Sequence, residues 1–443
     1  MVSKDTIFAV ATPPGRSAIA VIRISGSLAK QAPTFFGTIC PKAGQFKYAR
    51  LMIGGQVVDE VLILFMQGPR SSTGENVCEL HCHGSSAVVS IVLAKLAEMR
   101  GFRPAEPGEF TRRAFMHDKL DIFGVEGLAD VVDAETSKQL HQAWAQIDGC
   151  LRGPVALWRE ELIILASQLE ALIDFADEDL PKNVELTFRQ QAALLIKDIA
   201  NTLDDQRTGE LIRDGVVVAL VGPVNAGKST ILNGLSGRAA AIVSDEAGTT
   251  RDIISVRLDI NGVPTTILDT AGIRDAAGVI EAEGIRRTVE AAQHADVVVF
   301  VVDISSGNWS KDIEFLGGCI DHPNLIVLNK ADKVDTAEVP ADAMLISAHN
   351  DRDVVRLLAR IGEIVIPNNQ AQSSAVITRV RHREALQKAC DSLRAGLQHN
   401  FHITPELAAE DFRQAVVALG RITGEIDIEE LLDQIFLRFC IGK

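Results

Sequence analysis

The segment Gly222-Pro223-Val224-Asn225-Ala226-Gly227-Lys228-Ser229 fits the pattern Gly-x-x-x-x-Gly-Lys-Ser/Thr. It directly follows an apolar, β-branched run at 216–221, and a helical pattern follows at 231–235. In such a strand–loop–helix unit, loop N–H groups point at phosphate oxygens, the lysine neutralises phosphate charge and the serine hydroxyl binds Mg²⁺. A glycine-rich turn that binds no ligand could share this pattern. The neighbouring motifs therefore decide between a phosphate-binding loop and such a turn.

Three further motifs follow, each at the end of a predicted strand. Asp269-Thr270-Ala271-Gly272 offers a carboxylate that could hold Mg²⁺ through water and a glycine N–H that could meet a terminal phosphate. Asn329-Lys330-Ala331-Asp332 and Ser347-Ala348-His349 follow the next two apolar runs, at 325–328 and 344–346. An aspartate there can accept two hydrogen bonds from the N1–H and N2–H₂ edge of guanine, and adenine lacks this pair of donors. The four motifs in this order predict a Ras-like α/β GTPase domain.

A polar segment between the first two motifs is placed to fold over the terminal phosphate. Its spacing favours a switch segment that orders around GTP, and a solvated loop is the alternative. Ile273 follows the Asp-Thr-Ala-Gly motif where Ras-like enzymes use Gln to orient water, so water must be oriented differently here. The predicted GTP-binding residues are Asn225, Ala226, Gly227, Lys228, Ser229, Thr230, Ser244, Asp245, Glu246, Ala247, Gly248, Thr249, Thr250, Asp269, Thr270, Ala271, Gly272, Asn329, Lys330, Ala331, Asp332, Ser347, Ala348 and His349.

The composition is that of a globular chain with several cores. Its 443 residues suggest about three domains at roughly 150 residues each. The net charge of −15 excludes a protein held to nucleic acid or membrane by bulk charge. Seven cysteines are too few for a disulfide scaffold, and no apolar stretch reaches the roughly 18 residues of a membrane span. With no signal-peptide pattern at its start, the chain is expected to be cytoplasmic and to make no use of a membrane.

Hydrophobic periodicity changes along the chain and predicts its domain organisation. Short β-type runs at 19–24, 57–65 and 77–83, separated by Gly/Pro clusters, indicate an N-terminal α+β domain. Apolar residues then recur at helical spacing before and after the GTPase motifs, which predicts one all-helical domain that is discontinuous in sequence. We expect a multidomain α+β and α/β protein with boundaries at 1–118 (N-terminal domain), 119–213 and 368–443 (the two parts of the helical domain) and 214–367 (the inserted GTPase domain).

Motifs outside the GTPase domain identify a specific resemblance. They are Ala11-Thr12-Pro13-Pro14-Gly15-Arg16, Arg23-Ile24-Ser25-Gly26, Pro107-Gly108-Glu109-Phe110, Asp118-Lys119-Leu120-Asp121 and the terminal Cys440-Ile441-Gly442-Lys443. With them, the chain resembles the tRNA-modifying GTPase family MnmE, also called TrmE, over its whole length.

The resemblance implies a chemical site as well as a GTPase. It implies a homodimer that forms a heterotetramer with the flavoprotein MnmG (GidA), with FAD on the partner protein. Together they would add a carboxymethylaminomethyl group to C5 of the wobble uridine of certain tRNAs, using 5,10-methylene- or 5-formyl-tetrahydrofolate. Arg23, Glu79, Lys119 and Lys443 would line the folate site in the N-terminal dimerisation domain. Solvated surface charges are the alternative for each of these residues.

The resemblance also implies how hydrolysis proceeds. Potassium would replace an arginine finger and bind Asn225, Ser244, Glu246 and Thr249, and Ser229 and Thr250 would be the Mg²⁺ pair. Glu281 would orient water through a relay, and nearby Glu283 is the alternative.

Cys440 has two interpretations. The resemblance makes it a catalytic thiol near the folate, whereas its position beside Phe436 and Phe439 also fits a core-facing thiol. The functional alternative for the whole chain is a GTP-dependent RNA-binding switch in ribosome assembly. The sequence leaves open which tRNAs are modified, where tRNA docks, and whether glycine or ammonium is the second substrate.

Overall fold

The computed structural model describes most of the chain and divides it into two compact units. The described residues are 5–174, 183–205, 207–237, 242, 254–270, 289–320, 323–334, 339–341, 343–366, 377–424, 432, 435–437, 439 and 441–442. The first unit comprises residues 1–129, 146–160 and 416–443, and the second comprises 130–145 and 161–415. No described helix is both long and apolar enough to cross a lipid bilayer.

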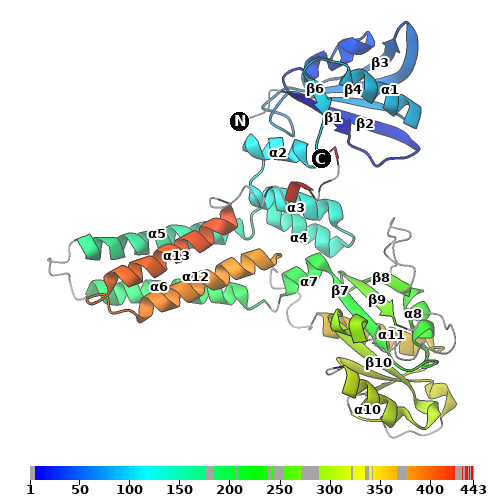
Figure 1. Cartoon of the computed structure of the whole chain (residues 1–443), viewed down its shortest axis with the longest axis vertical. Coiled ribbons are helices and arrows are strands. Elements are labelled where there is room, and N and C mark those ends of the chain that lie inside the picture. The colour runs from blue at the N-terminus through cyan, green and yellow to red at the C-terminus, as the bar shows by residue number, and fades with distance from the viewer. Residues whose placement is uncertain are drawn as a thin grey trace. The chain divides into compact units, whose positions relative to one another are not determined.

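The first unit contains a six-stranded mixed sheet (Figure 1). The strand order is β3-β4-β5-β2-β1-β6, in which β1 and β6 pair in parallel and the other neighbours are antiparallel. The predicted runs 19–24, 57–65 and 77–83 lie within β2, β4 and β5, as expected. The strands are β1 (Thr6–Val10), β2 (Ser17–Ser25), β3 (Phe46–Ile53), β4 (Gln56–Met66), β5 (Val77–Gly84) and β6 (Phe102–Pro104).

Side-chain alternation gives this sheet two different faces. The inward residues of β5, Cys78, Leu80 and Cys82, are buried in one apolar core together with residues of α1 (Ser86–Ala97). Helix α2 (Glu109–Met116) places Phe110 in a small cluster on the opposite face with residues of β1. Because alternate residues of a strand point to opposite faces, Glu79, His81 and His83 lie together on the face away from the core.

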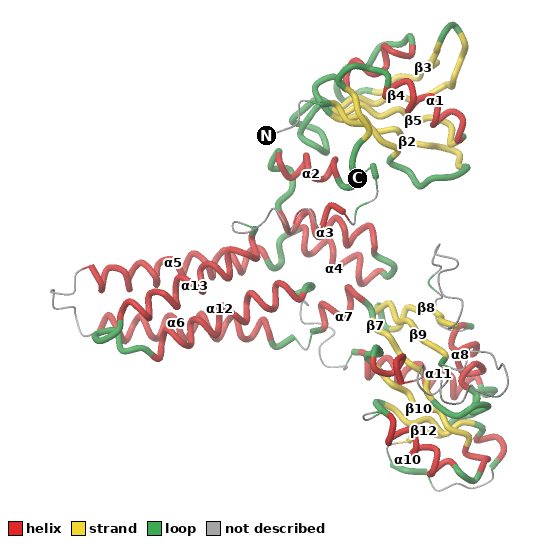
Figure 2. The backbone as a smooth tube through the Cα atoms, in the orientation of Figure 1, coloured by secondary structure: helices red, strands yellow, loops and turns green. Residues whose placement is uncertain are grey.

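The second unit contains a largely parallel sheet with strand order β12-β11-β10-β7-β9-β8 (Figure 2). Every neighbouring pair is parallel except β8 with β9. The predicted strands are confirmed, with β12 lying one residue earlier than the run 344–346. The strands are β7 (Val216–Val221), β8 (Ile254–Ile260), β9 (Val263–Asp269), β10 (Val297–Asp303), β11 (Leu325–Asn329) and β12 (Ala343–Leu345).

Helices cover both faces of the parallel sheet. Helices α8 (Lys228–Ser236) and α11 (Asp351–Val365) bury Leu232 and Leu357 in the core on one face. Helix α10 (Trp309–Cys319) contributes Leu316 to the core on the other. Burial on both faces explains why β7, β10 and β11 read as continuous apolar runs.

Helical segments from either side of the GTPase motifs meet in the second unit. Helix α6 (Asn183–Leu203) lies beside α12 (Val380–Gln398) (Figure 1). The ring of Phe188 on α6 contacts the rings of Phe401 and of Phe412, which lies on α13 (Pro405–Thr423). Arg413 of α13 also forms an ion pair with Glu170 of α5 (Arg152–Asp174). The predicted fold class, with a helical domain interrupted by an α/β GTPase domain, is confirmed.

A connecting segment joins these helices to the parallel sheet within the second unit. Asp130, at the end of α3 (Ile122–Asp133), forms ion pairs with Arg213 of α7 (Thr208–Asp214) and with Arg379. The Thr136 hydroxyl, just before α4 (Ser137–Ile147), donates to the carbonyl of Gly262 in the β8–β9 turn. A Cβ on Gly262, whose φ is +82°, would lie 2.7 Å from Cβ of Lys138, so glycine permits this close approach.

Candidate functional site

The loop between β7 and α8 has the backbone shape that a phosphate cradle requires. A Cβ on Gly222 would lie 1.9 Å from the carbonyl oxygen of Val301, so only glycine fits there. Gly227 has a φ of +94°, and a Cβ there would lie 2.2 Å from Nδ2 of Asn329. Asn225 also has a positive φ, 64°, a conformation that Asn tolerates better than most residues. The helix that follows begins at Lys228, so its free N–H groups face the loop.

Lys228 is held inside this loop by backbone carbonyls. Its Nζ donates to the carbonyl oxygens of Gly222 at 2.6 Å and Pro223 at 2.7 Å. The residue is only 3% exposed. Burial lowers the pKa of Lys228 to about 8, although the nearby Asp269 carboxylate opposes this shift. The Lys228 ammonium is thus held at the loop and poorly solvated. A poorly solvated cation attracts phosphate oxygens more strongly than one in water does.

Ser229 and Asp269 meet beside Lys228. The Ser229 hydroxyl donates to Oδ2 of Asp269 at 2.5 Å. Asp269 is the last residue of β9 and is fully buried. The next residue, Thr270, donates its hydroxyl to the carbonyl of Leu220 on β7. A hydroxyl and a carboxylate are oxygen ligands that Mg²⁺ prefers, so the residues present fit a magnesium ion.

Asn329 connects the phosphate loop to the last predicted motif. Its Nδ2 donates to the carbonyl of Ala226 at 2.8 Å, and its Oδ1 accepts from the N–H of Ala348 at 3.0 Å. The side chain is buried, at 1% exposure. The N–H of Ala331 donates in addition to the carbonyl of Ile346. These bonds hold the loops after β7, β11 and β12 against one another.

A small hollow of about 60 Å³ lies between these loops. The Ser347 hydroxyl donates to Oδ1 of Asp332 at 2.6 Å, and this bond lowers the pKa of the Asp332 carboxyl below its usual value. Asp332 is therefore an ionised acceptor at neutral pH, as recognition of the guanine edge requires. The hollow is lined by Gly227, Thr230, Asn329, Lys330, Asp332, Lys333, Ala348 and His349.

Two residues of this site were not predicted from the sequence. Lys333 lines the hollow, and Asp303, at the end of β10, forms an ion pair with Lys330 at 2.6 Å. Burial would raise the pKa of Asp303, but hydrogen bonds from Lys330 and Ser305 lower it overall. The sequence did carry a signal that could have identified Asp303 as a site residue. Asp303 ends β10, which lies between β7 and β11, and the carboxyl ends of parallel strands meet at one edge of the sheet.

Several predicted residues lie outside the described part of the chain. Those of the GTPase domain are Ser244, Asp245, Glu246, Ala247, Gly248, Thr249, Thr250, Ala271, Gly272, Glu281 and the alternative Glu283. At the end of the chain they are Cys440 and Lys443. Their predicted roles in binding nucleotide, K⁺, Mg²⁺ or folate stay predictions.

Two of the four predicted folate residues contact each other in the first unit. Arg23 of β2 and Glu79 of β5 are register partners, and Nε of Arg23 lies 2.9 Å from Oε1 of Glu79. A second guanidinium nitrogen of Arg23 donates to the carbonyl of Gly442 at 3.5 Å, so Gly442 of the terminal motif lies beside this pair. A Cβ on Gly442 would lie 2.1 Å from the carbonyl oxygen of Val10, which shows how closely Gly442 packs against β1. Lys119 is exposed in the turn after α2, and its ammonium makes no ion pair with a described residue.

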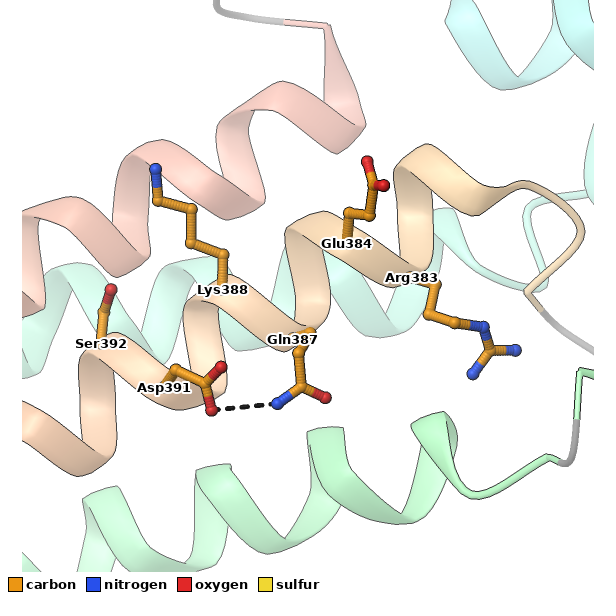
Figure 3. A pocket seen from close by; sticks show the side chains of 6 residues that line it. All are labelled: Arg383, Glu384, Gln387, Lys388, Asp391 and Ser392. Atoms are coloured by element: carbon orange, nitrogen blue, oxygen red, sulfur yellow. Dashed lines mark hydrogen bonds between the residues drawn. The ribbon is translucent and has the colours of Figure 1, made fainter.

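A wider, open hollow of about 470 Å³ lies along α12, away from the predicted motifs (Figure 3). Figure 3 shows Gln387 bonded to Asp391, while Lys388 and Ser392 point to the other side of the helix. Arg383 at its edge is already paired with Asp205 and Glu210. The side chains that line this hollow carry charges of both signs and do not point to one common place. The hollow therefore does not resemble a ligand site as the loops around Lys228 do. The lining residues are Arg383, Glu384, Gln387, Lys388, Asp391 and Ser392.

Comparisons with known proteins match the chain over nearly its whole length. Residues 6–119 match the family model of the GTP-binding protein TrmE N-terminus, and residues 123–440 match that of the MnmE helical domain. The tRNA modification GTPase MnmE of Parvibaculum lavamentivorans is 46% identical over 99% of this chain and 100% of that protein. The tRNA modification GTPase MnmE of Paramagnetospirillum magneticum is 44% identical over 99% of this chain and 100% of that protein. That of Granulibacter bethesdensis is 42% identical over 100% of both chains. This chain therefore belongs to the MnmE family of tRNA modification GTPases.

Proposed function

We propose that this chain hydrolyses GTP and acts in tRNA modification. The observation that carries the proposal is the double hydrogen bond of Asn329, which ties Ala226 in the phosphate loop to Ala348 at the base hollow. One buried amide thereby sets the spacing between the groups that bind phosphate and those that bind guanine. The shared name of the full-length relatives, tRNA modification GTPase, supports the same activity.

Nucleotide binding is proposed to use the described residues of the loops after β7, β11 and β12. Loop N–H groups and Lys228 bind the β- and γ-phosphates, and Asp332 accepts the N1–H and N2–H₂ donors of guanine. Adenine would leave the Asp332 carboxylate without these donors, so GTP is preferred over ATP. Thr230, Lys333 and His349 line the same hollow and would lie beside a bound base.

Two metal ions belong to the proposed hydrolysis. Ser229 and Thr250 would hold Mg²⁺ directly, and Asp269 would hold it through water; the ion neutralises charge on the β- and γ-phosphates. Asn225, Ser244, Glu246 and Thr249 would hold K⁺, which replaces an arginine finger. Support from described residues comes from the contact between Ser229 and Asp269 and from the positive φ of Asn225, which fixes the loop at that point. Glu281 would orient the attacking water.

The modification chemistry is proposed to occur in the first unit. With the flavoprotein MnmG (GidA), which carries FAD, the chain would add a carboxymethylaminomethyl group to C5 of the wobble uridine. A tetrahydrofolate derivative would supply one carbon and bind at Arg23, Glu79, Lys119 and Lys443, with Cys440 nearby. The match to the TrmE N-terminus and the contacts of Arg23 with Glu79 and Gly442 support this placement.

The proposed assembly is a homodimer that binds two MnmG chains in the cytoplasm and takes tRNA as substrate. GTP hydrolysis would change the conformation of this assembly around a separate chemical site.

Nucleoside analysis of tRNA tests the proposal in cells. A strain lacking the gene should lose the carboxymethylaminomethyl uridine, and the wild-type gene should restore it. Lys228→Ala should fail to restore it, whereas Lys311→Ala, an exposed lysine on α10 of the same sheet domain, should succeed. Unchanged tRNA nucleosides together with defective ribosome assembly would instead support the RNA-binding switch.

A further inference from the structure

His81 contacts the buried carboxylate of Glu79. The two residues are two positions apart on β5, so both point to the sheet face away from the core. Nε2 of His81 lies 3.2 Å from Oε2 of Glu79, whereas Arg23 occupies the other oxygen, Oε1, at 2.9 Å. The Glu79 side chain is only 11% exposed. Each oxygen of this carboxylate therefore has one nitrogen partner.

The cross-strand neighbours of His81 are apolar, so its polar partner on this sheet is Glu79. The residues opposite His81 in register are Val21 on β2 and Leu62 on β4. Neither side chain has a polar atom, so neither can compete for the imidazole. An ionised carboxylate only accepts hydrogen bonds, so Nε2 of His81 donates to it.

Two contacts fix a carboxylate more completely than one. With Arg23 alone, the Glu79 carboxylate could turn about its terminal bond, because that torsion has broad wells. A second donor on the other oxygen sets the plane of the group. Since each carboxylate oxygen has two acceptor positions, one on each oxygen stays open for a ligand. Two parallel acceptors match a ligand edge that carries an N–H beside an NH₂, such as the edge of a pterin.

We propose that His81 is a positioning residue of the folate site: it sets the plane of the Glu79 carboxylate so that the open acceptor positions receive the donor edge of the pterin. His81 acts through Glu79 and does not itself contact the ligand. The inference rests on the proposed folate function of Arg23 and Glu79.

Binding of 5-formyltetrahydrofolate to the purified full-length chain, measured by titration calorimetry, tests the proposal. His81→Ala should weaken binding by up to about tenfold, because the Glu79 carboxylate would then turn freely in the unbound chain and would have to be ordered when the ligand binds. His81→Leu, which keeps the side-chain volume, should weaken it equally. His81→Gln should bind within about twofold of wild type, because its amide NH₂ can donate to the same oxygen.

A matched control separates positioning from general stability. His399 forms a similar half-buried pair with Asp411 at 3.1 Å in the second unit, so His399→Ala should leave folate binding unchanged. Equal binding by wild type, His81→Ala and His81→Leu would overturn the role of His81. Weak binding by His81→Gln, or equal weakening by His399→Ala, would also overturn it. A wild-type chain that binds no folate would refute the proposed folate site itself, and the inference with it.

Discussion

The hydroxyl of Ser229 donates to Oδ2 of Asp269 at 2.5 Å, although the two residues are 40 positions apart in the chain. They meet because β7 and β9 are parallel neighbours, so the loop after β7 lies beside the last residue of β9. The contact places a hydroxyl and a carboxylate where Mg²⁺ would stand next to the phosphates.

Ser229→Ala should reduce the rate of GTP hydrolysis at least about tenfold, because the proposed direct Mg²⁺ ligand is lost. The loss should be partly recovered at high Mg²⁺ concentration. Ser236→Ala, at the other end of α8, is the control and should retain normal activity. Phosphate release measured across a Mg²⁺ titration checks this, and an unchanged Mg²⁺ dependence of Ser229→Ala would contradict it.

The low pKa of Lys228 predicts a pH dependence of GTP binding. Burial places this pKa near 8 in the nucleotide-free chain, whereas phosphate oxygens would favour the charged lysine in the complex. Below pH 8 the lysine is already protonated, so affinity should change little. Above pH 8, binding must take up a proton, and affinity should fall by up to about tenfold per pH unit.

Calorimetric titrations in buffers with different ionisation enthalpies would measure this proton uptake. We expect uptake close to one proton at pH 9 and almost none at pH 6.5. Lys228→Arg should show no uptake at either pH, since a guanidinium stays charged. An absence of uptake by the wild type at pH 9 would contradict the predicted state of Lys228.

The rate of hydrolysis should depend on the monovalent cation. K⁺ should accelerate it over Na⁺ at equal ionic strength, because a site built from Asn225 and switch-segment oxygens would suit the larger ion. Asn225→Ala should reduce the difference between the two salts, whereas Val224→Ala, an exposed neighbour in the same loop, should keep it. Identical wild-type rates in KCl and NaCl would refute the potassium site.

Modification chemistry should depend on the terminal motif while GTP hydrolysis does not. Removing residues 440–443 should abolish tRNA modification and leave hydrolysis within about twofold, since no described phosphate-site residue is touched. Gly442→Val should have the same effect, because a Cβ there would lie 2.1 Å from the carbonyl oxygen of Val10. Ile441→Ala, which alters a side chain that is 60% exposed, is the control.

Parallel assays of phosphate release and of modified nucleoside would distinguish the two activities. Full modification by Gly442→Val would show that tRNA modification does not require the close packing of Gly442 against Val10. Loss of GTP hydrolysis by a truncated chain that still folds would contradict the separation of the two sites.

The sequence predicted β2, β4 and β5 of the first sheet and β7, β9, β11 and β12 of the second, with the motifs that follow the latter four, whereas β1, β3, β6 and β8 were not predicted. Continuous apolar runs such as 216–221 identify buried parallel strands, and motifs that follow such strands must meet at one edge. This is why the order of runs and motifs is enough to place Lys228, Asp269 and Asn329 in one site. Short strands such as β6, of three residues, carry too little periodicity to be predicted.

Contacts that depend on register or on buried geometry could not be predicted in the same way. Glu79 and His81 are two positions apart in the predicted run 77–83, but this spacing alone does not show that the imidazole donates to the carboxylate. Likewise, Asn329 was predicted to bind GTP, whereas its bond to Ala226 depends on how closely Gly227 approaches it. Such relations arise from tertiary packing, which local patterns do not encode.

Nucleotide specificity tests most directly whether this chain is a GTP hydrolase. Phosphate release should be measured for wild type and Asp332→Asn with GTP, ATP and xanthosine triphosphate at equal concentrations. The wild type should hydrolyse GTP and hardly use ATP, and Asp332→Asn should shift preference toward xanthosine triphosphate, because an amide can donate to the extra carbonyl of xanthine. Equal turnover of ATP and GTP by the wild type, or an unchanged preference in Asp332→Asn, would contradict the assignment.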